Sequence, residues 1–265
     1  MRSSRSLIQT RRNQVLKSLY NNGTVNVQEI AKEMGVSPLT IRRDLETLEK
    51  AEKINRFYGG ASLNKKEEEE NNIFSSGYTL NKFAIARYAA ALVEDGDTIF
   101  INTSSTAVAI IPFIKAKHVT VITNNTRALN SELPNDMNLI FTGGEMRFPK
   151  EAMVGDFALN NLKNVTAAKC FLGCNGITAK EGLTTAVMQE ASINHLMLTR
   201  VMGPRYILAD KSKIGRKLNF IYGSIKDVTL LITDTEAPSH LIEELKNFID
   251  VYQVHPLSEL PYALV

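Results

Sequence analysis

VSPLTIRRDLETLEK, residues 36–50, is the segment that decides the fold of the N-terminal part of this chain. Ser37 belongs to the residue types that cap helix N-termini, and Pro38 suits the first helical position, where its missing N–H loses no hydrogen bond. An apolar stripe follows at helical spacing and consists of Ile41, Leu45 and Leu48. The segment is therefore predicted to form an amphipathic helix whose stripe faces a small core.

Arg42 and Arg43 are adjacent in this helix and lie off the apolar stripe, so both are expected to point to solvent. One interpretation is that they are ordinary surface charges that pair with Asp44, Glu46 or Glu49. The other is that they bind an anionic polymer, because arginine forks fit guanine edges and phosphate groups. The sequence around the helix favours the second interpretation.

A second short helix is predicted directly before this one. The segment NVQEIAKEMG, residues 26–35, begins at Asn26, a favoured capping residue, and ends at Gly35, which suits a helix C-terminus. The turn that contains this glycine would set the two helices across each other. Such a helix-turn-helix, predicted over about residues 25–44, places the N-terminal residues of its second helix in the major groove of DNA.

Residues 53–63, KINRFYGGASL, are predicted to form a two-stranded ribbon that turns at its glycine pair. Lys53 and Arg56 would project from this ribbon, which could lie along the phosphate backbone of DNA as a wing. The alternative is a plain hairpin that closes the small core, with Phe57 and Tyr58 as part of that core.

Charge is distributed unevenly along the 265 residues, whose formal net charge is +3. Residues 1–62 contain 11 Lys and Arg against 6 Asp and Glu, whereas the remaining residues contain 20 against 22. A basic N-terminal part on a slightly acidic body predicts an anionic polymer as the partner of that part alone.

Other features of the composition limit the class of protein. No apolar run approaches the length of a membrane helix, and the first residues lack the apolar segment of a secretory signal. A cytoplasmic protein without membrane contact is therefore expected. The two cysteines, Cys170 and Cys174, have no further cysteine pair or spaced histidines to complete a metal site, so reduced thiols packed in a strand are predicted.

The chain changes character after residue 63. Residues 64–78, NKKEEEENNIFSSGY, interrupt all periodicity and are predicted to link a domain at residues 1–63 to a domain at residues 79–265. In the second domain, short apolar runs rich in β-branched residues alternate with helix-length segments; these runs are TIFIN, VTVIT, NLIFT, KCFLGC, RYILA and VTLLIT. This order predicts an α/β fold with a mostly parallel sheet covered by helices on both faces.

Polar or glycine-rich residues follow these predicted strands. Ligands of parallel α/β sheets bind outside the carboxyl ends of the strands, so these residues are expected to form one site. They are Asn102, Thr103, Ser104, Ser105, Thr106, Asn124, Gly143, Gly144, Asn175, Gly176 and the segment Asp210–Lys213. The hydroxyl-rich loop Thr103–Thr106 precedes a predicted helix and could hold a phosphate, although such clusters are also ordinary turns.

The N-terminal part of the chain resembles a known protein family. Residues 23–61, GTVNVQEIAKEMGVSPLTIRRDLETLEKAEKINRFYGGA, resemble the winged helix-turn-helix of the DeoR family of bacterial transcription regulators, with its V-S-x-x-T-I-R-R-D-L core and a basic wing that ends in G-G-A. Ala51-Glu52 departs from the glycine that the family usually has before the wing. The residues expected to contact double-stranded operator DNA are Ser37, Leu39, Thr40, Arg42, Arg43, Lys53 and Arg56.

The resemblance continues into the second domain. The segments FTGGEMR, FLGCNGI, EGLTT and LADKSKIG, with the helix start at Glu190-Ala191, resemble the sensor domain of DeoR regulators, whose fold is similar to ribose-5-phosphate isomerase. The resemblance implies a phosphorylated sugar as effector, the loop Thr103–Thr106 as its phosphate site and Lys213 as the cation that faces it. Asn102, Asn124, Gly143, Gly144, Asn175, Thr185 and Glu190 would complete the pocket.

Two departures from the family bear on activity. The family commonly has Asp where this chain has Asn102, and D-G-I where this chain has Asn175-Gly176-Ile177. Isomerisation through an enediol needs a carboxylate base near the sugar carbons, and an amide cannot supply one, although Glu190 and Asp210 remain. The sequence therefore favours a sensor over an enzyme.

The resulting hypothesis is a transcriptional repressor of a carbohydrate operon that a sugar phosphate releases from DNA. No catalytic residue, cofactor or metal is expected. Because helix-turn-helix proteins commonly bind paired half-sites, a homodimer or homotetramer is expected. Two alternatives remain open: a sugar-phosphate isomerase with an appended DNA-binding head, and an activator or architectural DNA-binding protein without small-molecule control.

Overall fold

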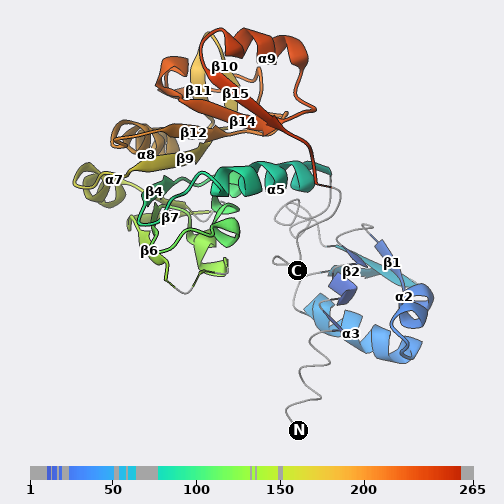
Figure 1. Cartoon of the computed structure of the whole chain (residues 1–265). Coiled ribbons are helices and arrows are strands. Elements are labelled where there is room, and N and C mark those ends of the chain that lie inside the picture. The colour runs from blue at the N-terminus through green and yellow to red at the C-terminus, as the bar shows by residue number, and fades with distance from the viewer. Residues whose placement is uncertain are drawn as a thin grey trace. The chain divides into compact units, whose positions relative to one another are not determined.

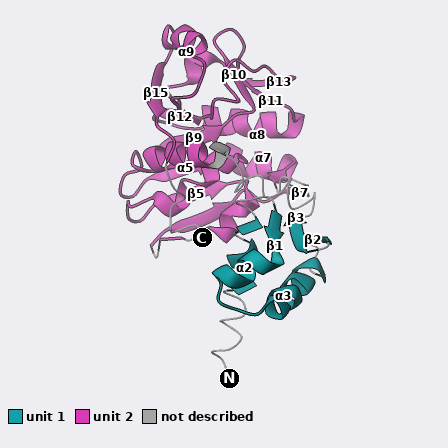
Figure 2. Cartoon of the chain, turned by 90° about the vertical axis from the view of Figure 1, so that its right-hand side faces the viewer, with its two compact units in different colours: residues 1–79 teal, residues 80–265 magenta. Residues whose placement is uncertain are grey.

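The computed structural model describes two compact units, formed by residues 1–79 and residues 80–265 (Figure 2). The described ranges are 11–12, 14–16, 18–19, 24–50, 54–57, 59–63, 77–131, 133–134, 136–148 and 152–257. Lys53 and residues 64–76 of the predicted linker lie outside them. Gly77 and Tyr78, which were also assigned to the linker, instead begin helix α5 (Gly77–Ala90).

The first unit combines helices with a small antiparallel sheet (Figure 1). The described residues between 11 and 19 are helical. The elements that follow are β1 (Thr24–Asn26), α2 (Val27–Glu33), α3 (Pro38–Lys50), β2 (Ile54–Phe57) and β3 (Gly60–Leu63). The strand order is β1-β3-β2, so the predicted ribbon is confirmed, and β1 adds a third strand that was not predicted.

Capping and burial fix the position of α3. Ser37 Oγ accepts the Thr40 backbone N–H at 3.2 Å, and Pro38 is the first helical residue. The predicted apolar stripe is buried and packs against the apolar side chains of the preceding helices; it consists of Ile41, Leu45 and Leu48. Because this stripe fixes the helix rotation, residues 42 and 43 face solvent.

The second unit is built on a seven-stranded sheet of order β15-β14-β12-β9-β4-β5-β6. Every neighbouring pair in it is parallel. The strands are β4 (Thr98–Ile101), β5 (Thr120–Thr123), β6 (Asn138–Phe141), β9 (Lys169–Gly173), β12 (Arg205–Leu208), β14 (Leu230–Asp234) and β15 (Asp250–Val254). The predicted parallel sheet and its six predicted strands are confirmed, and β15 is an edge strand that the sequence did not predict.

Helices cover both faces of this sheet, as the sequence predicted. On one face the buried residues of the strands pack against α7 (Asp156–Lys163), α8 (Met188–Thr199) and α9 (Ser239–Lys246). On the other face they pack against α5, α6 (Ser105–Val108) and the 3-10 turns η1 (Ile111–Phe113) and η2 (Thr126–Asn130). Alternate residues of β9 pack on opposite faces of the sheet. Phe171 packs on the α5 side, and Cys170 and Leu172 pack on the α8 side.

Two smaller antiparallel sheets were not predicted. One has the order β10-β11-β13 and contains β10 (Gly176–Thr178), β11 (Gly182–Thr185) and β13 (Phe220–Gly223), followed by the 3-10 turn η3 (Ile225–Asp227). The other pairs β7 (Glu145–Arg147) with β8 (Ala152–Val154). No helix in the described part of the chain is long and apolar enough to cross a membrane.

Candidate functional site

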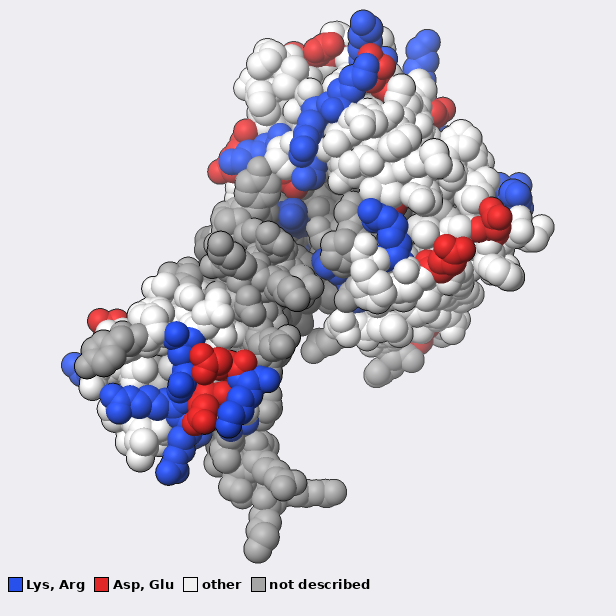
Figure 3. Space-filling view, turned by 180° about the vertical axis from the view of Figure 1, so that it is seen from behind, with Lys and Arg blue, Asp and Glu red and all other residues white. Residues whose placement is uncertain are grey.

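The first half of α3 presents an exposed polar surface on the first unit. Ser37, Arg42 and Arg43 are exposed, and Leu39 has 57% of its surface accessible although it is apolar. Ser37 Oγ and Thr40 Oγ1 lie 2.9 Å apart, so both hydroxyls sit at the helix start. On the side seen in Figure 3, Lys and Arg side chains of this unit flank a group of Asp and Glu, so the charge there is mixed.

Asp44 is not the partner of the two exposed arginines. It is 2% exposed and pairs instead with Arg11 Nε at 2.6 Å and Arg12 Nε at 2.9 Å, on the side of α3 that faces the core. Arg42 and Arg43 form no ion pair within the described residues. Their interpretation as charges neutralised by Asp44 is therefore wrong, since the carboxylate lies on the opposite side of the helix.

The remaining acids of α3 have partners of their own. Glu46 pairs with Lys50 at 3.2 Å, one helical turn further on. Glu49 pairs with the predicted wing residue Arg56, with 2.8 Å between Arg56 Nε and Glu49 Oε2. Arg56 does project from β2, but its charge is partly balanced by this pair.

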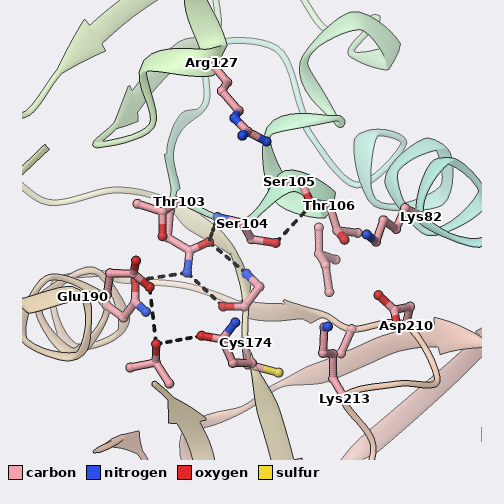
Figure 4. Close-up of a pocket in the computed structure, with 17 residues that line it drawn as sticks. Lys82, Thr103, Ser104, Ser105, Thr106, Arg127, Cys174, Glu190, Asp210 and Lys213 are labelled. Atoms are coloured by element: carbon pink, nitrogen blue, oxygen red, sulfur yellow. Dashed lines mark hydrogen bonds between the residues drawn. The ribbon is translucent and has the colours of Figure 1, made fainter. Parts of the chain in front are cut away.

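The second unit contains a polar cavity of about 160 Å³ (Figure 4). It opens at the carboxyl ends of β4, β9 and β12, where the sequence predicted a site. Of the predicted residues, the cavity is lined by Asn102, Thr103, Ser104, Ser105, Thr106, Asn175, Thr185, Glu190, Asp210 and Lys213. Segments more than 100 residues apart in the chain therefore meet here, because parallel strands all end at the same edge of the sheet.

Six predicted residues do not line this cavity: Asn124, Gly143, Gly144, Gly176, Lys211 and Ser212. Asn124 is fully buried, and its Nδ2 donates to the Met153 carbonyl at 3.0 Å. Gly143 and Gly144 have φ of 69° and 111° and form the turn between β6 and β7. A Cβ on Gly144 would lie 2.4 Å from the Val154 carbonyl oxygen, so this glycine permits a close backbone approach. Their place at a strand end is as predicted, but they shape the β7-β8 hairpin.

Asn102 lines the cavity, but its side-chain amide forms its hydrogen bonds with other groups of the protein. Its Nδ2 donates to the Gly173 carbonyl at 2.9 Å and to Asn194 Oδ1 at 3.0 Å. Its Oδ1 accepts the backbone N–H groups of Gly173 at 3.0 Å and Ser104 at 3.3 Å. An asparagine side chain has two donors and two acceptor sites, and all are used here. Asn102 therefore holds β4, β9 and α8 together beneath the cavity.

The hydroxyl loop differs from its predicted form in one respect. The helix that follows it, α6, has only four residues, and Ser104 Oγ already accepts the N–H groups of Thr106 at 3.2 Å and Ala107 at 3.4 Å. The helix start is thus capped by the protein itself. Thr103, Ser105 and Thr106 of this loop also line the cavity.

Glu190 lies at the end of the cavity nearest α8 and is 2% exposed. Its Oε1 accepts from Arg147 NH1 at 3.1 Å, and its Oε2 lies 3.3 Å from Thr185 Oγ1. The same hydroxyl lies 2.8 Å from Asn175 Oδ1. Carboxylate, hydroxyl and amide groups are therefore held at fixed positions in this part of the cavity.

The opposite end carries two lysines and a second carboxylate. Lys82 extends from α5, and Lys213 and Asp210 come from the loop after β12 (Figure 4). Burial lowers the pKa of Lys82, and Lys213 acts in the same direction, whereas Asp210 opposes both effects. Cys174 also borders this end, and burial raises the pKa of its thiol to about 12, which leaves it a poor nucleophile.

Several lining residues were not predicted as site residues. Lys82 lies on α5, Arg127 on the 3-10 turn η2 and Asn194 on α8. No sequence motif or strand end marks these positions. Gly173 and Cys174 are at a strand end, so the rule that found Asn102, Asn175 and Asp210 could have found them as well. Within the described ranges no cluster of three or more His, Cys, Asp or Glu side chains could hold a metal ion.

A helix-turn-helix with a ribbon, followed by an α/β domain with a polar cavity, defines a two-domain DNA-binding regulator with a ligand-sensing domain. The family model of the DeoR-like helix-turn-helix domain matches residues 11–67, and that of the DeoR C terminal sensor domain matches residues 79–235. The chain belongs to the DeoR family. Its members are transcription regulators, so the isomerase alternative is excluded.

Relatives match along most of their length. The chain is 29% identical over 247 residues to the lactose phosphotransferase system repressor of Staphylococcus aureus (strain N315), which covers 91% of this chain and 97% of the relative. It is 33% identical over 239 residues to the protein of the same name from Lactococcus lactis subsp. lactis, with 86% and 92% covered. It is 30% identical over 225 residues to the HTH-type transcriptional regulator FruR of Bacillus subtilis (strain 168), with 84% and 89% covered.

Two solved structures match part of the chain. Ribose 5-phosphate isomerase A from Methanocaldococcus jannaschii has a TM-score of 0.37 at 18% identity, covering 52% of this chain and 55% of that one. The translation initiation factor eIF-2B from Pyrococcus horikoshii OT3 has a TM-score of 0.35 at 18% identity, with 56% and 51% covered. Similarity at this level says nothing about activity.

Proposed function

We propose that this DeoR regulator represses a carbohydrate operon and that a phosphorylated sugar, bound in the cavity of the second unit, lowers its affinity for DNA. The observation that carries this proposal is the division of the cavity into two chemically different ends. A phosphorylated sugar has the same division, with a dianionic group at one end and hydroxyls along the rest.

The lysine end suits a phosphate. The Lys213 ammonium forms no ion pair with any described residue, and the hydroxyls of Thr103, Ser105 and Thr106 line the same cavity. Ammonium and hydroxyl groups are strong donors to phosphate oxygens. A doubly charged phosphate would also compensate the positive charge that gathers here.

The carboxylate end suits a polyol. Glu190 and Asn175 supply acceptors, and the Thr185 hydroxyl, whose proton points to these two side chains, can accept a hydrogen bond. Fixed polar groups of this kind give a pocket its specificity, because a ligand that leaves them unpaired binds poorly. The names of the relatives are consistent with this class of ligand, since two of those above are repressors of a lactose phosphotransferase system.

On the first unit, the start of α3 is the proposed surface for operator DNA. Arg42 and Arg43 would reach base edges or phosphates, and the exposed Leu39 could contact a thymine methyl group. Ser37 and Thr40 would bond to phosphate at the edge of the groove. Arg56 and Lys53 on the ribbon are the proposed backbone contacts, and Lys53 lies outside the described residues.

Calorimetric titration of the purified chain tests the ligand class. A phosphorylated hexose should bind with measurable heat, whereas the same hexose without phosphate should not. Lys213→Met should lose this binding, while Lys226→Met, an exposed lysine in η3, should bind as the wild type does. Equal binding of phosphorylated and free hexose, or full binding by Lys213→Met, would contradict the proposal.

The sign of regulation is tested separately in cells. A reporter fused to the neighbouring operon should become more active when the gene for this chain is deleted, because a repressor has been removed. Lower reporter activity after deletion would identify an activator instead. An unchanged response of the reporter to every sugar in the medium would favour the alternative without small-molecule control.

A further inference from the structure

Two arginines of the helical segment before β1 share one buried carboxylate of α3. Arg11 Nε lies 2.6 Å from Asp44 Oδ2, and Arg12 Nε lies 2.9 Å from Asp44 Oδ1. The Asp44 side chain is 3% exposed, whereas the side chains of Arg11 and Arg12 are 21% and 26% exposed. Each guanidinium therefore turns its Nε toward the interior and keeps part of its surface in contact with solvent.

This cluster has an excess of positive charge. Two guanidinium groups and one carboxylate leave a net charge of +1 on the three side chains. An arginine has five N–H donors, and Asp44 accepts only the Nε donor of each. Among the described residues, these side chains make one further hydrogen bond, from Arg12 NH2 to Thr47 Oγ1 at 3.2 Å. The cluster thus retains donors and charge that suit an anion from outside the chain, and arginine forks fit phosphate well.

The cluster lies next to the surface of α3 that is proposed to contact DNA. Thr47 Oγ1, which accepts from Arg12, itself donates to the Arg43 carbonyl at 3.0 Å. Thr47 and Arg43 are both exposed and stand one helical turn apart on the same face. The major groove is about 12 Å wide, close to the diameter of a helix, so side chains that flank a helix in this groove meet phosphates.

We propose that Arg11 and Arg12 contact phosphates of the operator DNA, and that Asp44 is the positioning residue that holds both guanidinium groups beside α3. This inference rests on the proposed function, because it takes the exposed face of α3 as the surface for DNA. It extends that surface onto a second helix. The contacts that it adds are independent of sequence and dependent on salt, unlike the contacts of residues that read bases.

The salt dependence of DNA binding tests the two phosphate contacts. The full chain is titrated by fluorescence anisotropy, at several salt concentrations, on a duplex from upstream of its own gene and on a duplex of unrelated sequence. Arg11→Met and Arg12→Met should each reduce the steepness of log affinity against log salt by about 0.9 and weaken both duplexes by a similar factor. Each variant leaves Asp44 paired with the other arginine, so the fold should be retained.

Lys50→Met is the matched control for this experiment. It removes one positive charge from the end of α3, where Lys50 is exposed and paired with Glu46. The steepness of its salt dependence should equal that of wild type.

The positioning role is tested with Asp44→Asn. Loss of a negative charge near DNA would by itself tighten binding, because its repulsion of phosphate is gone. An amide is uncharged and keeps only one of the two oxygens, so at least one arginine loses its partner. We therefore expect weaker binding and a salt dependence less steep by about 0.9 or more. Partial unfolding would reduce the amount of active protein but leave the steepness unchanged, and thermal unfolding followed by circular dichroism measures the folded fraction.

The outcomes separate this inference from the proposed function. If Arg11→Met and Arg12→Met both keep the wild-type salt dependence, neither arginine contacts phosphate and the inference is overturned. If Asp44→Asn binds both duplexes more tightly than wild type, the carboxylate does not position the arginines and that part is overturned. If Arg42→Ala and Arg43→Ala both bind the upstream duplex like wild type, the proposed DNA surface on α3 fails, and this inference fails with it.

Discussion

At the scale of single residues, ion pairs decide which charges of α3 remain available for a partner. Arg11 and Arg12 form ion pairs with Asp44 on the buried side of the helix. Lys50 pairs with Glu46, and Arg56 pairs with Glu49. Arg42 and Arg43 are left exposed at the end of the helix that enters a DNA groove in this motif.

Arg42→Ala and Arg43→Ala are each expected to weaken operator binding. A residue that reads a base should cost about 1–3 kcal/mol and relax specificity at that base, whereas a phosphate contact should weaken all sequences alike. Fluorescence anisotropy at fixed salt measures both quantities. Lys50→Ala is the matched control, because Lys50 lies on the same helix but is paired with Glu46 at the other end. Wild-type affinity in both arginine variants would show that α3 is not the reading helix.

Asn102 shows why a cavity residue need not be a ligand. Its amide makes four hydrogen bonds to the protein, so a change to the carboxylate that the family commonly carries here removes two donors. Asn102→Asp should therefore destabilise the chain by about 1–3 kcal/mol. Burial raises the pKa of a carboxyl group, so the loss should be larger at neutral than at acidic pH.

Urea unfolding followed by circular dichroism measures this loss. Asn219→Asp, at an exposed position, makes the same chemical change without burial and should leave the unfolding midpoint near that of wild type. An unfolding midpoint for Asn102→Asp as high as that of the Asn219 control would mean that the four hydrogen bonds contribute little to stability.

At the scale of elements, the cavity depends on how closely β9 approaches the hydroxyl loop. A Cβ added to Gly173 would lie 2.0 Å from Ser104 Oγ, which caps α6. Gly173→Ala should displace Ser104, cost about 1–3 kcal/mol of stability and abolish ligand binding. Adding Ser104→Gly to this variant removes the clash and should recover stability without recovering the cap. Normal ligand binding by Gly173→Ala alone would contradict this account of the loop.

The elements also show what the sequence could predict. The inner strands of the large sheet are short apolar runs with buried residues on both faces, and α3 has a strong apolar stripe, so these elements were predicted and are confirmed. Antiparallel strands such as β10, β11 and β13 are three or four residues long and have no such pattern. Their pairing depends on contacts distant in sequence, which a local pattern does not contain.

Part of the candidate site could also be predicted from the sequence. The rule that ligands bind at strand ends predicted Asn175, Lys213 and the loop Thr103–Thr106, which line the cavity. The same rule predicted Asn124, Gly143 and Gly144, which do not line the cavity. A position at a strand end does not tell how far that strand lies from the centre of the sheet. Lys82 and Arg127 reach the cavity from helical segments on which nothing local marks them, so only the fold brings them in.

At the scale of the whole molecule, the predicted oligomer remains to be measured. Sedimentation equilibrium of the full chain should give two or four times the chain mass of 29.5 kDa, since two recognition helices are needed for two half-sites of an operator. A monomer that binds one palindromic operator as two independent copies would contradict this expectation.

The central claim is that binding of a phosphorylated sugar in the second domain controls the affinity of the first domain for DNA. A complete switch requires the ligand to prefer one arrangement by about 10⁴-fold, and partial switches require proportionally less. The most direct measurement is fluorescence anisotropy of the purified chain on DNA from upstream of its own gene and of the neighbouring operon, at fixed salt, with and without a panel of sugar phosphates. Tight binding that one sugar phosphate weakens, and that the free sugar leaves unchanged, is the predicted result. Tight binding that no sugar phosphate alters would contradict the account and leave the second domain without its proposed role.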